Sequence, residues 1–443
     1  MAETAGRSAG EPGDIIELEP SNPAHGGEFV ARYEGRVVFV SDAIDGERVE
    51  ARLVDTTHDG FWRAQTVRVL KPSPYRRAHV WPEAGLERDP SARPGGAEYG
   101  HIALPYQRAL KGRVVGEALS RLAGLERVVE VAPAPGDDAA GGLAWRTKVR
   151  LHAGPRGFGP YAGRSHRVVE VGSLPLAVPE VAQAAPLPGR GEADERLAGA
   201  RAVDVVADDG AAVLAYRRGP ATGRRRPRAR EKWHTLPAGH AVVRRRVAGH
   251  SFEVHAAGFW QVHRRAAGVL FDAVTAALGD LDPSAAHLDL YGGVGLFAAA
   301  LAAKTGPDGT ITSVESADEA TRHARHNLAR WPRVAAVGAP VEPYLARLGR
   351  VASADERARL AAGVVVLDPP RSGAGKAVVG HLVRIAPARV VYVACDPVAL
   401  ARDLGYFRAA GFEVEEVRAF DLFPHTHHVE AVATLRPPER RRR

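Results

Sequence analysis

Cysteine is nearly absent from this chain, since Cys395 is the only one among 443 residues. A single thiol excludes an intrachain disulfide, a zinc site built on several cysteines and an iron–sulfur cluster held by this chain's own cysteines. The chain also lacks any run of about 18 apolar residues, so the sequence predicts no membrane-spanning helix. Residues 1–13 are polar and have no apolar core of the kind that signal peptides carry. We therefore expect a cytoplasmic protein without a membrane partner.

Acidic residues are outnumbered by basic ones, 52 against 60, which gives a formal net charge of +8. With 45% hydrophobic and 25% charged residues, the composition is that of a globular chain long enough for several domains and excludes a disordered or fibrous protein. Residues 217–246 contain eleven cations and one acid, Glu231. Such a block either stays solvated or contacts phosphate, and the sequence leaves both open. Arg224, Arg225 and Arg226 are its candidate phosphate contacts.

Short alternating runs of apolar and polar residues fill the region from Asp14 to Leu70. Turn signals such as Asp45-Gly46 and Asp59-Gly60 separate them, which is typical of a small closed β-barrel. Barrels of this size often bind oligonucleotides, although a spacer without a ligand has the same pattern. The five predicted strands are residues 15–18, 29–33, 36–40, 48–54 and 63–70.

The middle of the chain has a weaker pattern. Residues 71–100 are rich in proline and glycine and predict a linker, and apolar residues at helical spacing predict a helix over 106–125. Residues 132–142 predict a loop. The expected strands in this region are residues 145–152, 157–161, 167–171 and 200–206.

The last 190 residues alternate β-branched runs with helical patterns, which indicates a parallel sheet with helices on both faces. Ligands of such folds sit beyond the carboxyl ends of the strands. The predicted strands are residues 287–291, 310–315, 364–368 and 390–395. Helices are predicted over residues 297–304, 317–330, 376–385 and 398–404.

Glycines follow the first of these strands, in residues 289–297, where the backbone can approach a ligand closely. Glu315 ends the next strand, where a carboxylate can accept both hydroxyls of a ribose. The pair fits any nucleoside cofactor, and a purely structural tight turn is the alternative.

Two further residues at strand ends carry chemistry, and so does a carboxylate nearer the C-terminus. Asp368 precedes two prolines that stiffen the turn and direct its carboxylate into the cleft, with Arg371 completing the motif. Cys395 ends a strand just before a helix, whose N-terminus would favour a thiolate nucleophile, although a lone cysteine is more often a buried apolar residue. Glu430 follows three histidines on an extended segment whose rings cannot all converge, so we expect a base here and no metal site.

Together these residues resemble the RNA uracil-C5 methyltransferase family, whose members make 5-methyluridine in transfer and ribosomal RNA. Residues 1–72 look like its TRAM module and residues 145–161 look like its middle domain. The matching segments of the last domain, in the family's order, are Phe-Trp-Gln-Val-His (259–263), Asp-Leu-Tyr-Gly-Gly-Val-Gly (289–295), Asp-Pro-Pro-Arg (368–371), Ala-Cys-Asp-Pro (394–397), Leu-Ala-Arg-Asp-Leu (400–404) and His-Val-Glu (428–430).

The resemblance implies three domains: an OB-like TRAM barrel (1–72), a linker and mixed α+β central domain (73–250), and a Rossmann-like class I methyltransferase domain (251–443). The helix at 106–125 is a candidate to pack on the methyltransferase domain. It assigns the attack on uracil C6 to Cys395 and removal of the C5 proton to Glu430. Arg371 is expected to contact RNA together with the basic block. For the cofactor, S-adenosylmethionine, the implied binding residues are Gln261, Tyr291, Gly293, Gly295, Glu315 and Asp368.

The sequence departs from the family pattern at several positions. Ala394 and Asp396 flank the cysteine where serine and asparagine are usual, and His263 replaces an asparagine. Gly292 and Leu296 replace the cysteine and asparagine that are frequent in the glycine loop. Residues 95–99 lack the cysteines with which many relatives hold an iron–sulfur cluster, so we expect none here.

We therefore expect a monomeric enzyme that methylates C5 of a uridine in tRNA or rRNA. Two alternatives remain: a non-catalytic RNA-binding or chaperone protein that retains a cofactor fold, and an RNA methyltransferase that acts on a base amine. Retention of both Cys395 and Glu430 disfavours the first, and Arg371 in place of an aromatic residue disfavours the second.

Overall fold

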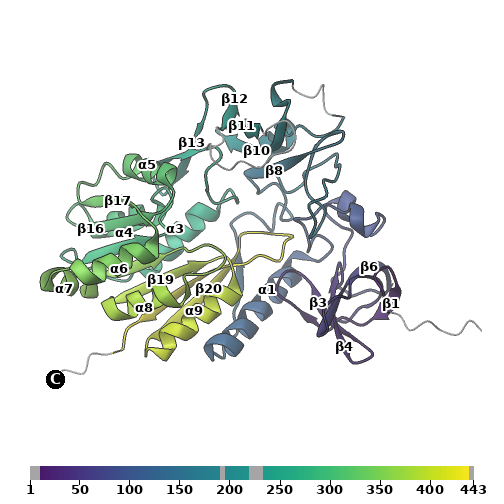
Figure 1. Cartoon of the computed structure of the whole chain (residues 1–443), viewed down its shortest axis with the longest axis horizontal. Helices are drawn as coiled ribbons and strands as arrows, with labels where there is room; N and C mark the ends of the chain where they lie inside the picture. The colour runs from purple at the N-terminus through teal and green to yellow at the C-terminus, as the bar shows by residue number, and fades with distance from the viewer. Residues whose placement is uncertain (1–9, 190–194, 219–232, 439–443) are drawn as a thin grey trace, which may run out of the picture.

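The computed structural model describes residues 10–189, 195–218 and 233–438. The chain forms three parts, namely an N-terminal curled sheet, a central domain and a C-terminal α/β domain (Figure 1). Within the described residues, no helix is both long and apolar enough to cross a membrane. Arg224, Arg225 and Arg226 lie outside the described residues, as does the tail 440–443.

The N-terminal sheet has six strands in the order β1-β5-β6-β4-β3-β2. All five predicted strands are present, and β2 is an additional two-residue strand before β3. Alternate side chains point into a core that includes Phe29, Val38 and Ile44, as the period of two requires. The strands are β1 (Ile15–Leu18), β2 (Asn22–Pro23), β3 (Phe29–Tyr33), β4 (Arg36–Ser41), β5 (Arg48–Asp55) and β6 (Phe61–Lys71).

The linker contains two short 3-10 turns, Pro82–Ala84 and Pro90–Ala92. The central domain is built on an antiparallel sheet in the order β12-β11-β10-β8-β9. Its strands are β8 (Lys148–Gly154), β9 (Gly157–Gly159), β10 (Ala200–Asp208), β11 (Ala211–Arg218) and β12 (His234–Leu236), with α2 (Pro179–Ala184) packed against β10 and β11.

The strand predicted over 167–171 does not form, because only Val168 pairs there, in an isolated bridge with Tyr161. A hairpin, β13 (Val242–Val247) and β14 (His250–His255), follows the central sheet and packs on α5 (Asp318–Asn327). The expected domain boundary at residue 250 therefore interrupts a hairpin.

The C-terminal domain contains an eight-stranded sheet in the order β17-β16-β15-β18-β19-β21-β20-β7. The predicted strands are present, and the runs of valine, isoleucine and leucine in them are buried on both faces, as parallel sheets require. Only β21 runs antiparallel to β19 and β20. The strands are β15 (Ala286–Leu290), β16 (Thr310–Glu315), β17 (Val334–Gly338), β18 (Val364–Leu367), β19 (Arg389–Ala394), β20 (Glu413–Asp421) and β21 (Glu430–Arg436).

Helices cover both faces of this sheet (Figure 1). One apolar core includes α3 (Ala266–Ala277), α4 (Leu296–Thr305) and α5, and the other includes the helices on the opposite face. Those helices are α6 (Val341–Val351), α7 (Ala354–Ala362), α8 (Gly375–Ile385) and α9 (Pro397–Ala409).

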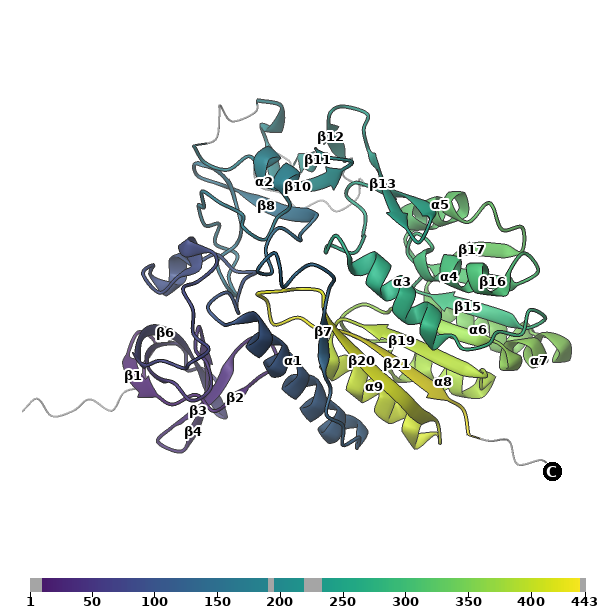
Figure 2. The same ribbon diagram turned by 180° about the vertical axis from the view of Figure 1, so that it is seen from behind.

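The segment before the central domain belongs spatially to this sheet. Helix α1 (Leu104–Ala118), which continues as a π-helical turn (Leu119–Ala123), packs on α9, and β7 (Val131–Pro133) adds to the sheet beside β20 (Figure 2). A Cβ on Gly405 would lie 2.5 Å from the carbonyl oxygen of Leu122, so glycine permits this close approach. Residues 132 and 133 were predicted to belong to a loop, but they are part of β7, the eighth strand of this sheet.

Candidate functional site

The chemically distinctive side chains converge at one edge of the C-terminal sheet. We call it the catalytic edge because the expected catalytic residues, Cys395 and Glu430, lie there. Asp289, Glu315, Asp368 and Cys395 stand at the carboxyl ends of β15, β16, β18 and β19, which run parallel and neighbour one another in the sheet. Strand β21 starts at the same edge because it is antiparallel, and its pairing of Ala431 with Ala394 places Glu430 beside Cys395. The sheet alone therefore brings together residues that are up to 141 positions apart.

The glycine loop after β15 is held against β16. The amide of Gly293 donates to Glu315 Oε2 (3.1 Å), and the amide of Ala317 donates to Glu315 Oε1 (2.7 Å). Gly292 has no space for a side chain, since a Cβ there would lie 2.1 Å from Ser313 Oγ. Gly293 and Glu315, both predicted cofactor residues, are thus in direct contact.

Asp289 organises this loop, although the sequence did not single it out as a site residue. Its Oδ2 accepts hydrogen bonds from Ser313 Oγ (2.9 Å) and from the amide of Ala298 (3.1 Å) at the start of α4. Its Oδ1 is buried without a hydrogen-bond partner among the described residues. The available signal was its position, because it is a charged residue inside an otherwise apolar strand.

The other predicted cofactor residues surround the loop. Tyr291 and Gly295 adopt positive φ angles of 62° and 96°, and burial raises the pKa of the Tyr291 phenol to about 12. Gln261 lies between β14 and α3, in a segment anchored to the central domain by the amide of Thr147, which donates to the Val262 carbonyl (2.7 Å). No hydrogen bond joins Gln261 to the glycine loop within the described residues, but its neighbour Trp260 shares an apolar cluster with Val294 of that loop.

Three carboxyl groups at the site have raised pKa values. Burial raises the pKa of Asp289 to about 7. Burial and then the charge of Asp289 raise the pKa of Asp368 to about 7. Burial and then the charge of Asp368 hold the pKa of Glu430 well above its ordinary value, while Arg371 acts in the opposite direction. Burial thus disfavours the ionised forms of these carboxyl groups, and a cationic ligand would stabilise those forms.

Cys395 is partly buried next to these carboxyl groups. Burial, followed by the charges of Glu430 and Asp368, raises the pKa of its thiol to about 12, and Arg371 opposes this rise. The expectation that the helix N-terminus favours a thiolate is therefore wrong for the ligand-free protein. The α9 terminus is occupied by Asp396, whose Oδ1 accepts the amide of Ala399 (2.8 Å), and the charge of Asp396 raises the thiol pKa further.

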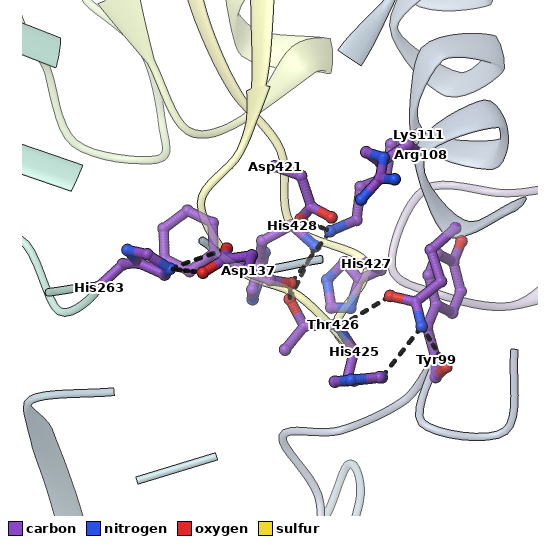
Figure 3. Close-up of polar contacts among 12 residues, drawn as sticks. Tyr99, Arg108, Lys111, Asp137, His263, Asp421, His425, Thr426, His427 and His428 are labelled. Carbon is purple, nitrogen blue, oxygen red and sulfur yellow. Dashed lines mark hydrogen bonds and ion pairs between the residues drawn. The ribbon is translucent and has the colours of Figure 1, made fainter. Parts of the chain in front are cut away.

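The loop between β20 and β21 carries the three histidines that precede Glu430 (Figure 3). Each of them has different partners. Gln107 Nε2 lies 3.0 Å from His425 Nδ1, His427 Nδ1 lies 3.5 Å from Glu98 Oε2, and Arg371 Nη2 lies 3.1 Å from His428 Nε2. The imidazoles therefore do not converge on one point. Instead, they connect this loop to α1, to the linker and to the catalytic edge.

A buried ion pair anchors the same loop (Figure 3). Lys111 Nζ on α1 lies 2.5 Å from Asp421 Oδ1 at the end of β20 and also donates to the carbonyl of Phe423 (3.0 Å). Both side chains are almost fully buried. A second buried contact joins His263 Nε2 to Asp137 Oδ2 (3.0 Å), so the unusual histidine at position 263 has a partner in the residues after β7.

The N-terminal sheet also reaches the catalytic edge, a contact that no local sequence pattern predicts. His25 Nε2, in the turn between β2 and β3, lies 3.3 Å from Asp396 Oδ2. A Cβ on Gly27 would lie 3.1 Å from the side chain of His427. The turn thus contacts the residue that follows Cys395 and the loop that precedes Glu430.

Comparisons with known proteins identify relatives of this chain. The family model described as tRNA (Uracil-5-)-methyltransferase matches residues 347–437. The chain is 40% identical to an uncharacterized RNA methyltransferase of Streptomyces avermitilis, over 96% of this chain and 99% of the relative. It is 30% identical to the 23S rRNA (uracil(1939)-C(5))-methyltransferase of Halomonas elongata, over 99% of this chain and 92% of that one.

One solved structure covers nearly the whole chain. The tRNA (uracil-54, C5)-methyltransferase of Pyrococcus abyssi, crystallised with S-adenosyl-L-homocysteine, has a TM-score of 0.65 and 20% sequence identity, and the match covers 94% of this chain and 99% of that one. The two proteins share a fold.

Proposed function

Because this chain belongs to the S-adenosylmethionine-dependent RNA (uracil-C5)-methyltransferase family, we propose that it methylates C5 of a uridine in tRNA or rRNA through a covalent intermediate on Cys395. The observation that carries this proposal is the pairing of β19 with β21, which sets the only thiol of the chain beside a buried carboxyl group, Glu430. Asp368 and Arg371 complete this cluster, since their charges act on the pKa values of both groups.

Uracil chemistry explains why a thiol and a carboxylate are needed together. C5 of uracil is a poor nucleophile, so Cys395 first adds to C6 and gives C5 enolate character. After C5 has taken the methyl group, Glu430 removes the C5 proton and the thiolate leaves by elimination. The two residues act in different steps, so each is required separately. The target uridine must be unpaired or flipped out, because C6 is inaccessible inside a stacked duplex.

The residues present fit S-adenosylmethionine. Gly293 has open space for the close approach of a ligand, Glu315 has its carboxylate beside the loop, and Oδ1 of Asp289 has no hydrogen-bond partner among the described residues. The buried carboxyl groups of Asp289, Asp368 and Glu430 suit a positively charged sulfonium ligand, which supplies the methyl group when bound. A bound cation also stabilises the ionised form of Asp368, so we expect cofactor affinity to rise with pH through about 7.

We propose that Arg371 also acts in catalysis, in addition to its expected contact with RNA. Its charge lowers the pKa values of both Cys395 and Glu430, against the dominant effect of burial. A cation at this position favours the thiolate needed for attack and the carboxylate needed for proton removal. We also propose that the chain holds no iron–sulfur cluster, in agreement with Ala97, which is buried in an apolar cluster with Trp81 and Leu174.

Covalent trapping tests the proposal directly. The full chain is incubated with S-adenosylmethionine and 5-fluorouridine-containing RNA, whose C5 carries no removable proton. A denaturation-resistant adduct should form with the wild type and disappear in Cys395→Ser. Glu430→Gln should accumulate the adduct even with ordinary RNA and lose turnover by about 10²–10⁴-fold, whereas Glu416→Gln, at an exposed position on β20, is the matched control.

The outcomes separate the alternatives. Methyl transfer that survives Cys395→Ser would indicate an amine methyltransferase, and the absence of adduct and transfer with total tRNA and rRNA would indicate a non-catalytic protein. Mapping 5-methyluridine in RNA from a deletion strain identifies the target uridine.

A further inference from the structure

A cavity of about 540 Å³ opens in the central domain, outside the catalytic edge. Its walls are the linker residues 95–98, strand β8 with the residues before it, and the loops 160–166 and 174–177. We call it the central cavity. Its volume is within the range of about 300–1,000 Å³ that small-ligand sites occupy.

The central cavity combines stacked aromatic rings with cationic groups. His152 and Tyr161 stack with ring centroids 3.6 Å apart and an interplanar angle of 13°, and His166 meets Tyr161 edge-on at 5.3 Å. Arg164 also lines the cavity, where its Nη2 donates to the carbonyl of Gly26 (2.9 Å) and pairs with Glu28 Oε2 (3.0 Å). Unpaired nucleotides bind proteins through aromatic stacking of the base and cationic contacts to the phosphate.

One cation at this cavity lacks a counter-ion. Arg146 Nε donates to the carbonyl of Lys148 (3.1 Å), but within the described part of the chain its terminal nitrogens have neither a hydrogen bond nor an ion pair. Burial lowers the pKa of Arg146, the charge of Glu98 raises it, and the charge of Arg371 lowers it. Arg146 therefore stands between the central cavity and the catalytic edge, with capacity for an anion.

A second cavity lies beside the central cavity. Its volume is about 270 Å³, it shares Gly95, Glu98, Gly163 and Arg164 with the central cavity, and His427 is among its lining residues. His427 belongs to the loop that leads into Glu430. The central cavity therefore adjoins a hollow that reaches this loop.

We propose that the central cavity binds one unpaired nucleotide of the substrate RNA other than the target uridine, with its base against Tyr161 and its phosphate near Arg164. This proposal rests on the proposed function for the identity of the RNA. The enzyme would then bind the nucleotide in the cavity and the uridine at Cys395 at the same time. It would therefore require a folded RNA segment that presents two unstacked bases.

Substitution of Tyr161 tests the stacking contact. Base–aromatic stacking of about 1–3 kcal/mol predicts that Tyr161→Leu weakens binding of the substrate RNA by roughly 5- to 150-fold. Tyr161→Phe, which keeps the ring, should bind within about twofold of the wild type because no hydrogen bond of the phenol occurs among the described residues. Binding of S-adenosylmethionine should be unchanged in both variants, because the cofactor residues lie at the carboxyl ends of β15, β16 and β18.

Equal RNA affinity of Tyr161→Leu and the wild type would overturn the proposal. So would a loss shared by Tyr161→Phe, or a parallel loss of cofactor binding, since either indicates a structural role. Photo-crosslinking of 4-thiouridine-containing RNA to the wild-type chain provides a test without substitution. A crosslink from residues 160–166 to a nucleotide other than the methylated uridine supports the proposal, and a crosslink to the methylated uridine or to none refutes it. RNA binding is measured independently of methylation, so a failure of the proposed function is recognised by the missing covalent adduct alone.

Discussion

Removing the negative partner of Lys111 should strongly destabilise the C-terminal domain. Lys111 and Asp421 are 0% and 1% exposed and lie 2.5 Å apart. In Asp421→Asn the ammonium group stays buried with only the Phe423 carbonyl as a strong acceptor. Loss of one partner of a buried pair typically costs about 3–5 kcal/mol. Since domains are stable by only about 5–15 kcal/mol, we expect a large loss in the free energy of unfolding.

The pH dependence of this loss has a definite sign. Burial already lowers the pKa of Lys111 and Asp421 opposes that effect, so Asp421→Asn should lower the pKa of Lys111 further. The unfolded chain then binds the lysine proton over a wider pH range than the folded chain, and stability rises with pH across that range. The difference between wild type and Asp421→Asn should therefore shrink from pH 7 to pH 10.

Urea denaturation at the two pH values, followed by circular dichroism, measures both effects. The double variant Lys111→Met/Asp421→Leu should recover most of the loss, because an apolar pair of similar volume leaves no buried charge. The control is Arg156→Met, which breaks an exposed pair with Glu170 and should cause no measurable change. The reasoning would be refuted if Asp421→Asn lowered the free energy of unfolding by less than about 1 kcal/mol, or by the same amount at pH 7 and pH 10.

Three further predictions concern the catalytic edge. Because the thiol pKa is about 12, alkylation of Cys395 by iodoacetamide in the ligand-free protein should accelerate roughly tenfold per unit from pH 7 to 10, and a plateau below pH 9 would contradict the geometry. Gly292→Ala should abolish binding of S-adenosylmethionine in calorimetry, since its Cβ would lie 2.1 Å from Ser313 Oγ, whereas Gly349→Ala has open space and should bind normally. Gly27→Ala should lower kcat with intact RNA, because a Cβ would lie 3.1 Å from His427 and the backbone there has a φ of 81°, and unchanged turnover would exclude a role for the turn.

Much of the site could be predicted because its signals are local. The carboxyl ends of parallel strands meet at one edge, so recognising the strands was enough to bring Glu315, Asp368 and Cys395 together. Glu430 joined them through the family resemblance, since its position depends on the antiparallel pairing of β21. The strand predicted over 167–171 failed, because a short apolar run does not reveal whether a neighbouring strand is available to pair with it.

The single cysteine, the strand-end carboxylates and the alternation of strands and helices were fixed by the amino-acid sequence, since each depends on residue type and short spacing. Only the tertiary structure decided that β7 joins the C-terminal sheet, that Lys111 anchors the loop between β20 and β21 and that His25 reaches Asp396. These contacts join residues far apart in the chain, so no local pattern encodes them. The protonation of Cys395 also depends on the fold, because burial and the charges of Glu430 and Asp368 set its pKa.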